Sequence, residues 1–128
     1  MSTVAQKLGI KPGNAVAVDG MSVDETTRLL GELPDGVAVS GRNGATADQA
    51  ILVADDLAGL ALKLGGVWDE VAAGGRLWVW YRKGARAQGS DVPLHRDTLQ
   101  ALLAEHGMDG VTLVSIDDTW SSMRVRRL

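Results

Sequence analysis

The chain has 128 residues, a hydrophobic fraction of 45% and a formal net charge of −3. This length fits one domain over residues 1–128, which can bury roughly two-thirds of the surface that its unfolded form exposes. The composition excludes a disordered chain, and the charge gives no reason to expect general nucleic-acid binding. No cysteine is present, which excludes disulfides, thiolate metal sites and a cysteine nucleophile.

The cellular location is predicted from features that the chain lacks. Residues 1–9 have no charged start followed by an apolar core, so no secretion signal is visible. No apolar stretch approaches the ~20 residues that a membrane span requires. We therefore expect a cytoplasmic protein without a membrane partner.

The first half of the chain contains three short apolar runs, bounded by turn residues, that predict strands. These runs cover residues 15–19, 37–40 and 50–54. After the first run, Ser22 and Glu25 have the S-x-x-E spacing of a capping box, which predicts a short helix over residues 23–30. Residues 45–49 are expected to form one helical turn.

The second half begins with a longer predicted helix over residues 57–73, ended by Gly74 and Gly75. Its apolar residues recur at the one-face helical spacing. They are Leu57, Leu60, Leu64, Val67, Trp68 and Val71. Residues 76–81 are apolar on both faces, as expected for a covered central strand.

The last predicted elements are a helix that ends near His106, a strand and a closing hairpin. The buried stripe of the helix is expected to be Leu99, Leu102 and Leu103. A strand over residues 111–117 is followed by a short link into an antiparallel strand over residues 122–127. This alternation predicts an α/β fold with an open, mostly parallel sheet and an antiparallel strand near one edge.

Two features of this order resemble the Rossmann-like class I methyltransferase fold. One is the stretch Gly74-Gly75-Arg76-Leu77-Trp78-Val79, and the other is the closing strand, short turn and reversed strand. The chain also resembles an uncharacterised bacterial domain-of-unknown-function family (number 3052). The phrases that carry this second resemblance are Leu8-Gly9-Ile10-Lys11-Pro12-Gly13, Gly31-Glu32-Leu33-Pro34-Asp35-Gly36, Leu77-Trp78-Val79, Val92-Pro93-Leu94 and Asp117-Asp118-Thr119-Trp120-Ser121. That family has no established activity, so the resemblance implies a fold and no catalytic residue.

The chain departs from active methyltransferases at the places where they hold their cofactor. Their glycine-rich G-x-G-x-G pattern is replaced by Gly20, Ser22 and Asp24. At the end of the second strand, the acidic residue that binds the ribose hydroxyls of the cofactor in these enzymes is replaced by a segment ending in Arg42. About ten residues lie between the second strand and Ile51, too few for the usual helix and edge strand. We therefore expect a trimmed sheet, no S-adenosylmethionine bound in the standard manner, and no cofactor.

Ligands of open α/β sheets bind outside the carboxyl ends of the strands, where the strand order reverses. The first and third strands are expected to meet there and to bring together Asp19, Asp55 and Asp56. Clustered carboxylates could hold a divalent cation or an amine. The alternative is that they cap the following helices and stay solvated, and Asp56 suits an N-cap well.

A basic loop at the carboxyl end of a later strand is the stronger candidate. Arg82, Lys83 and Arg86 are three cations on a glycine-containing loop, a pattern typical of a phosphate or carboxylate site. The alternative is an ordinary solvated loop. His95 borders this loop, and a histidine can serve as a general acid or base, although a surface histidine explains it equally. His95 and His106 lie too far apart on one helix for a metal pair, so we expect no metal site.

Two functions from different classes follow from these residues. The first, which we favour, is a non-catalytic binding or regulatory module that takes a small anionic ligand or a protein partner near Arg82, Lys83 and Arg86. The second is a divergent small-molecule enzyme, a relative of methyltransferases, that uses Asp19 or Asp55 with His95 as acid–base groups. Small α/β domains often pair through an edge strand or a helix face, so either function is compatible with a homodimer.

Overall fold

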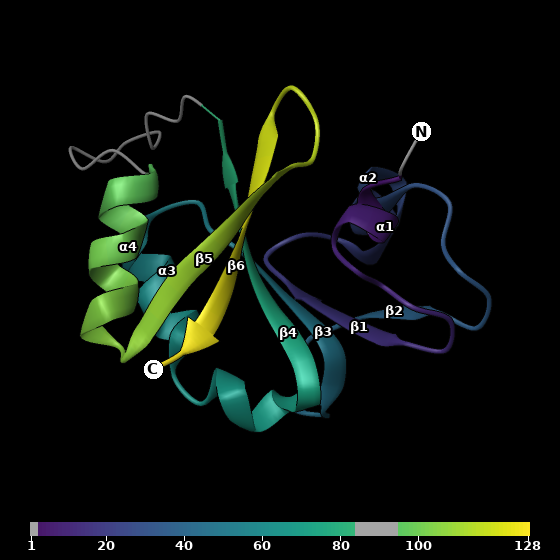
Figure 1. The fold of residues 1–128 in the computed structure, drawn as a ribbon, viewed down its shortest axis with the longest axis horizontal. Helices are drawn as coiled ribbons and strands as arrows, with labels where there is room; N and C mark the ends of the chain where they lie inside the picture. Colours follow the sequence, from purple (N-terminus) through teal and green to yellow (C-terminus); the bar gives the residue numbers. More distant parts are fainter. Residues whose placement is uncertain (1–2, 84–94) are drawn as a thin grey trace.

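The computed structural model describes residues 3–83 and 95–128 and contains a sheet flanked by helices (Figure 1). The helices are α1 (Val4–Lys7), α2 (Val23–Leu30), α3 (Leu57–Leu64), the 3-10 helix η1 (Val67–Glu70) and α4 (Arg96–Glu105). The strands are β1 (Ala15–Asp19), β2 (Ala38–Gly41), β3 (Ala47–Val53), β4 (Val71–Arg82), β5 (Met108–Ser115) and β6 (Trp120–Arg127). Among the described residues, no helix is long and apolar enough to cross a membrane.

The strands form one sheet with the order β2-β1-β3-β4-β6-β5. The four strands from β2 to β4 run parallel, while β6 is antiparallel to both of its neighbours. The predicted mostly parallel sheet with an antiparallel strand near one edge is therefore confirmed. Because β1 and β3 are neighbours, the strand order reverses between them, and their carboxyl ends are where an open α/β sheet places its ligand.

The connection between β2 and β3 passes over β1 with residues 42–46 alone. This is shorter than the dozen or so residues that a parallel crossover usually needs, and it holds neither a helix nor a strand. The expected trimming of the sheet is confirmed. The helical turn predicted at residues 45–49 is wrong, because pairing with β1 and β4 draws residues from Ala47 onward into β3.

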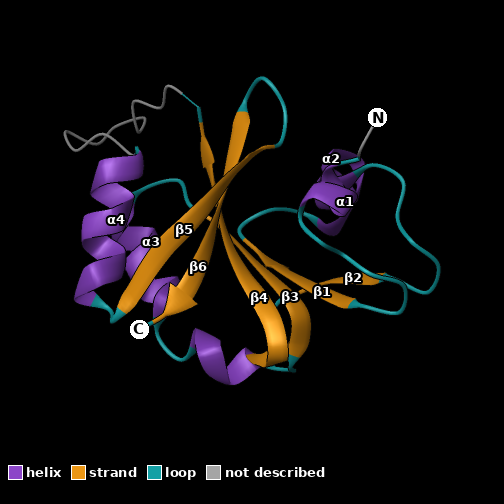
Figure 2. Ribbon diagram, viewed as in Figure 1, coloured by secondary structure: helices purple, strands orange, loops and turns teal. Residues whose placement is uncertain are grey.

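Helices cover both faces of the sheet, α1 and α2 on one side and α3 and α4 on the other (Figure 2). On the α3/α4 face the largest fully buried side chains are Leu52, Leu60, Leu64, Leu77, Leu99 and Leu103. On the α1/α2 face they are Leu8, Leu30, Ile51, Trp78 and Trp80. Trp78 and Trp80 therefore pack beneath helices, as the alternation of apolar residues along their strand predicts.

The long helix predicted over residues 57–73 is wrong in extent. α3 ends at Leu64, and Gly66 follows in the left-handed conformation with φ of 70°. Gly74 and Gly75 end no helix, because they lie inside β4. The six apolar residues of the predicted stripe nevertheless all pack into the core on the α3/α4 face. Their spacing indicated the buried side correctly, but consecutive glycines after Leu64 stop the helix.

α2 has the predicted bounds, but only half of its capping box forms. Ser22 Oγ accepts a hydrogen bond from the Glu25 backbone N–H at 3.1 Å. The Glu25 carboxylate does not return to the Ser22 backbone and pairs with Arg28 on the next turn instead. α1, which the sequence analysis did not predict, has a complete capping box between Thr3 and Gln6.

A polar junction joins the segment after α1 to the middle of the sheet. The buried Trp78 indole Nε1 donates to Gln49 Oε1 at 2.9 Å, and Gln49 Nε2 donates to the Gly9 carbonyl at 3.3 Å. Arg76 Nη1 donates to the Leu8 carbonyl at 3.1 Å. Gln49 and Arg76 satisfy backbone carbonyls that α1 leaves open, and Trp78 orients Gln49, so the amino-terminal segment is held against β3 and β4.

Candidate functional site

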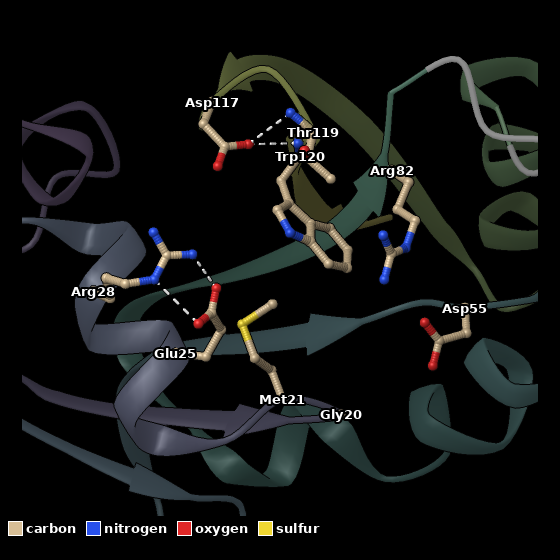
Figure 3. A pocket seen from close by; sticks show the side chains of 9 residues that line it. All are labelled: Gly20, Met21, Glu25, Arg28, Asp55, Arg82, Asp117, Thr119 and Trp120. Atoms are coloured by element: carbon tan, nitrogen blue, oxygen red, sulfur yellow. Dashed lines mark hydrogen bonds and ion pairs between the residues drawn. The ribbon is translucent and has the colours of Figure 1, made fainter.

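A pocket of about 560 Å³ lies at the carboxyl ends of the strands, on the α1/α2 face (Figure 3). We call it the strand-end pocket. Its lining residues are Gly20, Met21, Glu25, Arg28, Asp55, Arg82, Asp117, Thr119 and Trp120. They come from the turn after β1, from α2, from the ends of β3 and β4, and from the β5–β6 turn. The volume falls within the roughly 300–1,000 Å³ of small-molecule sites.

One side of the pocket carries Asp55 and Arg82 on neighbouring strand ends. Val53 pairs with Trp80 in the parallel register of β3 and β4, and Asp55 and Arg82 each follow this pair by two residues. Neither side chain makes a hydrogen bond or an ion pair with the described residues. The Arg82 guanidinium instead lies over the Trp120 ring, 4.8 Å from its centroid. This cation–π contact favours one position of the guanidinium and leaves its N–H donors available.

The other side carries Glu25 and Arg28 from α2 and Asp117 from the turn after β5 (Figure 3). The hydrogen bond from Arg28 lowers the pKa of Glu25 below its ordinary value of 4.5, while the negative charge of Asp117 opposes the shift. Asp117 Oδ1 accepts hydrogen bonds from the backbone N–H groups of Thr119 and Trp120, both at 2.8 Å. The turn therefore holds Trp120, which is 8% exposed, against the pocket.

Asp19, predicted to join this site, lies in an ion-pair network and does not line the strand-end pocket. Its carboxylate lies 3.3 Å from Arg42 Nη1 and 3.6 Å from Lys63 Nζ. Arg42 also bonds Glu70 through Nη2 at 2.7 Å and through Nε at 3.1 Å, and it donates to the Lys63 carbonyl at 2.8 Å. The network joins the ends of β1 and β2 to α3 and η1.

The remaining predicted residues have local roles in the structure. Lys83 bonds the Ser115 hydroxyl with its Nζ, and its backbone N–H donates to the Thr119 carbonyl at 2.7 Å. His95 is the N-cap of α4, where its Nδ1 accepts from the Asp97 backbone N–H at 3.2 Å. Asp56 caps α3, as predicted, by accepting from the Gly59 N–H at 2.6 Å. Arg86 lies outside the described residues.

The space into which a Cβ on Gly20 would point is filled by the chain itself. Gly20 has φ of 101°, and a Cβ at this position would lie 2.4 Å from Lys63 Nζ and 2.7 Å from the Val53 carbonyl oxygen. Lys63 Nζ donates to that same carbonyl at 2.8 Å. Lys63 and β3 therefore require a glycine at this position, which also lines the strand-end pocket.

The site contains three charged residues that the sequence analysis did not select. Glu25 and Arg28 are spaced i, i+3 on the helix after β1, a spacing that places both side chains on one face of that helix. Asp117 closes the Asx turn of the hairpin. Among the described residues, no group of three histidine or acidic side chains is arranged to hold a metal ion.

Replacing Arg42 by alanine is expected to lower the free energy of unfolding by about 1 to 3 kcal/mol at pH 7. The hydrogen bonds of Arg42 hold the pKa of Glu70 below its ordinary value of 4.5. This stabilisation is present above pH 4.5 and is lost as the pH falls through the lowered pKa of the folded state. Urea unfolding of both proteins should therefore show their difference shrinking below pH 4.5.

The control for this prediction is Arg28→Ala, which breaks the Glu25–Arg28 pair on α2, whose side chains are 41% and 65% exposed. Water screens such a pair, so its loss should change stability much less than the loss of Arg42. A difference between the parent and Arg42→Ala that stayed constant from pH 7 to the acid limit would show that the network does not carry the stability assigned to it.

Comparison with known proteins gives matches in structure alone. No protein-family model matches the chain, and no curated protein matches it. A protein from Bordetella parapertussis described as "a possible exported protein" superposes with a TM-score of 0.62 at 12% identity, over 96% of this chain and 64% of its own length. An S-adenosylmethionine-dependent methyltransferase from Aquifex aeolicus has a TM-score of 0.61 at 12% identity, over 95% of this chain and 86% of its own.

A third similar structure is the O-methyltransferase NcsB1 from neocarzinostatin biosynthesis, in complex with S-adenosylmethionine and 2-hydroxy-5-methyl naphthoic acid. Its TM-score is 0.59 at 19% identity, over 91% of this chain and 49% of its own. The chain has a class I methyltransferase-like fold. At these identities the likeness shows the fold alone. The chain spans about half of the NcsB1 chain and less than two-thirds of the Bordetella protein.

The strand ends of this chain do not carry the residues that the resemblance implies for S-adenosylmethionine, which the NcsB1 structure contains. Gly20 is followed by Met21 and Ser22 in place of further glycines, and Lys63 Nζ lies where a Cβ on Gly20 would point. At the end of β2, Arg42 bonds Glu70 and Asp19 in the place where the resemblance implies an acidic residue for the ribose. We therefore derive no chemical step through this cofactor.

Proposed function

We propose that the protein is a non-catalytic binding module that takes a small anionic molecule in the strand-end pocket. The observation that carries this proposal is Arg82, whose guanidinium enters the pocket with no ion pair or hydrogen bond to the described residues. An arginine with free donors matches the geometry of a carboxylate or phosphate. The location also agrees with the general rule for ligands of open α/β sheets.

The pocket has the parts that binding needs. The ring of Trp120 keeps the guanidinium of Arg82 in one position, so the arginine loses little conformational entropy when an anion binds. Met21 and Trp120 supply an apolar surface next to the charge (Figure 3). Lys83 and Arg86 were predicted beside Arg82, and the proposal now places the principal anion contact on Arg82 alone.

The proposal is tested by measuring the thermal stability of the parent protein and of Arg82→Gln against a panel of carboxylates, phosphates and nucleotides. A specific ligand should raise the melting temperature of the parent, because it binds the folded state. Arg82→Gln should weaken the affinity by about tenfold or more, which corresponds to about 1.4 kcal/mol. The matched control is Arg126→Gln, an exposed arginine on β6 that lines no part of this pocket. Equal ligand affinity in all three proteins would refute the assignment of Arg82.

The second candidate function is a divergent small-molecule enzyme related to methyltransferases, which the fold of the similar structures favours. It requires S-adenosylmethionine or another reactant at the strand ends. Against it, His95, the proposed acid–base partner of Asp55, caps α4 and does not line the pocket that Asp55 lines. A clear rise in melting temperature with S-adenosylmethionine, lost in Arg82→Gln or strengthened in Lys63→Ala, would favour the enzyme over the binding module.

A further inference from the structure

We infer that the ligand of the strand-end pocket is a zwitterion of the α-amino-acid class, with its carboxylate at Arg82 and its ammonium group at Asp55. This inference rests on the proposed function and specifies its ligand. It makes Asp55 as important for binding as Arg82, and it excludes simple anions as the best ligands.

The charges of the pocket argue against a purely anionic ligand. Three carboxylates and two guanidinium groups line it. Glu25 and Arg28 neutralise one another through their ion pair. Asp55 and Asp117 then remain against the single cation of Arg82, so the remaining charge is negative. An anion bound at Arg82 would be repelled by these carboxylates unless the same molecule also carried a positive charge.

The positions of Asp55 and Arg82 suit two charges on neighbouring atoms. Arg82 ends β4, and Asp55 follows the end of the neighbouring strand β3 by two residues. No ion pair joins the two side chains, and the Arg82 guanidinium lies over the Trp120 ring. Both side chains point into the same part of the pocket (Figure 3). An α-amino acid, whose ammonium and carboxylate share one carbon, would bridge the open space between them.

The rest of the pocket accommodates a side chain of such a ligand. Met21 and Trp120 lie between the Asp55–Arg82 side and the opposite side formed by Glu25, Arg28 and Asp117 (Figure 3). A ligand held by its head group at Asp55 and Arg82 would therefore extend along an apolar surface toward these charges. Asp117 uses Oδ1 for the turn, which leaves Oδ2 without a partner among the described residues.

The inference is tested by NMR titration, following the indole N–H signal of Trp120 in the full chain. The probes are the proteinogenic amino acids and a matched set of norleucine, hexanoate and pentylamine. Hexanoate and pentylamine each lack one charge of norleucine. We expect at least one amino acid to bind with a dissociation constant of about 1 mM or lower, and norleucine to bind about tenfold more tightly than either matched probe.

Replacing Asp55 or Arg82 should remove one of the two binding preferences of the pocket. Asp55→Asn should remove the preference for norleucine over hexanoate, and Arg82→Gln should remove the preference for norleucine over pentylamine. Asp69→Asn, which changes an exposed carboxylate on η1 outside this pocket, is the matched control and should change neither preference. Circular dichroism of each variant checks that the loss of a binding preference is not caused by unfolding.

The outcomes separate this inference from the proposed function. If hexanoate binds as tightly as norleucine, or if Asp55→Asn leaves the preference for norleucine over hexanoate unchanged, the inference of a zwitterionic ligand is wrong. The proposal of anion binding at Arg82 then stands. If no amino acid shifts the Trp120 signal at about 10 mM whereas another anion does, the inference is overturned and the binding module remains. If neither amino acids nor the anion panel bind, both proposals fall.

Discussion

Replacing Trp78 by alanine is expected to lower the free energy of unfolding by about 3 to 5 kcal/mol. The side chain is 1% exposed and lies in the core beneath α1 and α2. The substitution removes this packing and also leaves Gln49 Oε1 without its hydrogen-bond donor. Because domains of this size are stable by about 5 to 15 kcal/mol, the variant should lose a large part of its stability. Urea unfolding followed by circular dichroism measures the change.

Two further variants make this expectation testable even if Trp78→Ala does not fold. Trp78→Phe keeps most of the ring and removes the N–H donor, so it should lower the free energy of unfolding by about 1 to 3 kcal/mol. Leu62→Ala changes a side chain that is 86% exposed and should stay within about 0.5 kcal/mol of the parent. A Trp78→Phe variant as stable as the parent would show that the bond to Gln49 contributes nothing.

Replacing Gly20 by alanine is expected to lower the free energy of unfolding by about 2 to 5 kcal/mol. Its φ of 101° is strained for any residue with a Cβ, and the new methyl group would meet Lys63 Nζ and the Val53 carbonyl oxygen. The lysine can move aside, but the carbonyl belongs to the backbone of the strand next to β1. The change should therefore disturb β3 as well as the turn after β1. Urea unfolding compared with the parent gives the magnitude.

Gly13→Ala is the matched control for this second prediction. Gly13 also has a positive φ, 81°, but no atom lies within 4 Å of the Cβ that a substitution would add. The two variants share backbone strain and differ in steric contact. The larger decrease in the free energy of unfolding expected for Gly20→Ala therefore measures the effect of the close approach of β3 and Lys63. An equal decrease in the free energy of unfolding in the two variants would mean that Lys63 and β3 move away from the new methyl group at little cost. The close approach of Lys63 and β3 to Gly20 would then contribute nothing to the requirement for glycine.

The strands β1 to β4 could be predicted from the sequence because each contains a short apolar run. The run at residues 15–19 matches β1, and the predicted helix over residues 23–30 matches α2. The failures lie where tertiary pairing overrides local preference. Residues 47–49 joined β3 because two neighbouring strands pair with them, and no local pattern contains that information. Residues 71–73 continued the helical spacing of apolar residues but lie in β4.

The candidate site could be predicted only in part. Asp55 and Arg82 follow apolar strands, so their place at the carboxyl edge was visible in the sequence, and both line the pocket. Asp19 follows an apolar strand in the same way but pairs with Arg42, which comes from a connection whose path the sequence did not reveal. Glu25 and Arg28 were missed because an i, i+3 pair on a short helix usually describes a solvated surface. Their role depends on the β5–β6 turn folding over α2.

The connection at residues 42–46 has a consequence for local unfolding of the molecule. An edge strand as short as β2 would ordinarily fray, and its amide protons would exchange rapidly with solvent. Arg42 prevents independent fraying, because its backbone N–H donates to the Val18 carbonyl while its side chain bonds Glu70 in η1. Opening of β2 therefore requires the release of η1 as well. The peripheral strand and η1 should behave as one cooperative unit in hydrogen exchange.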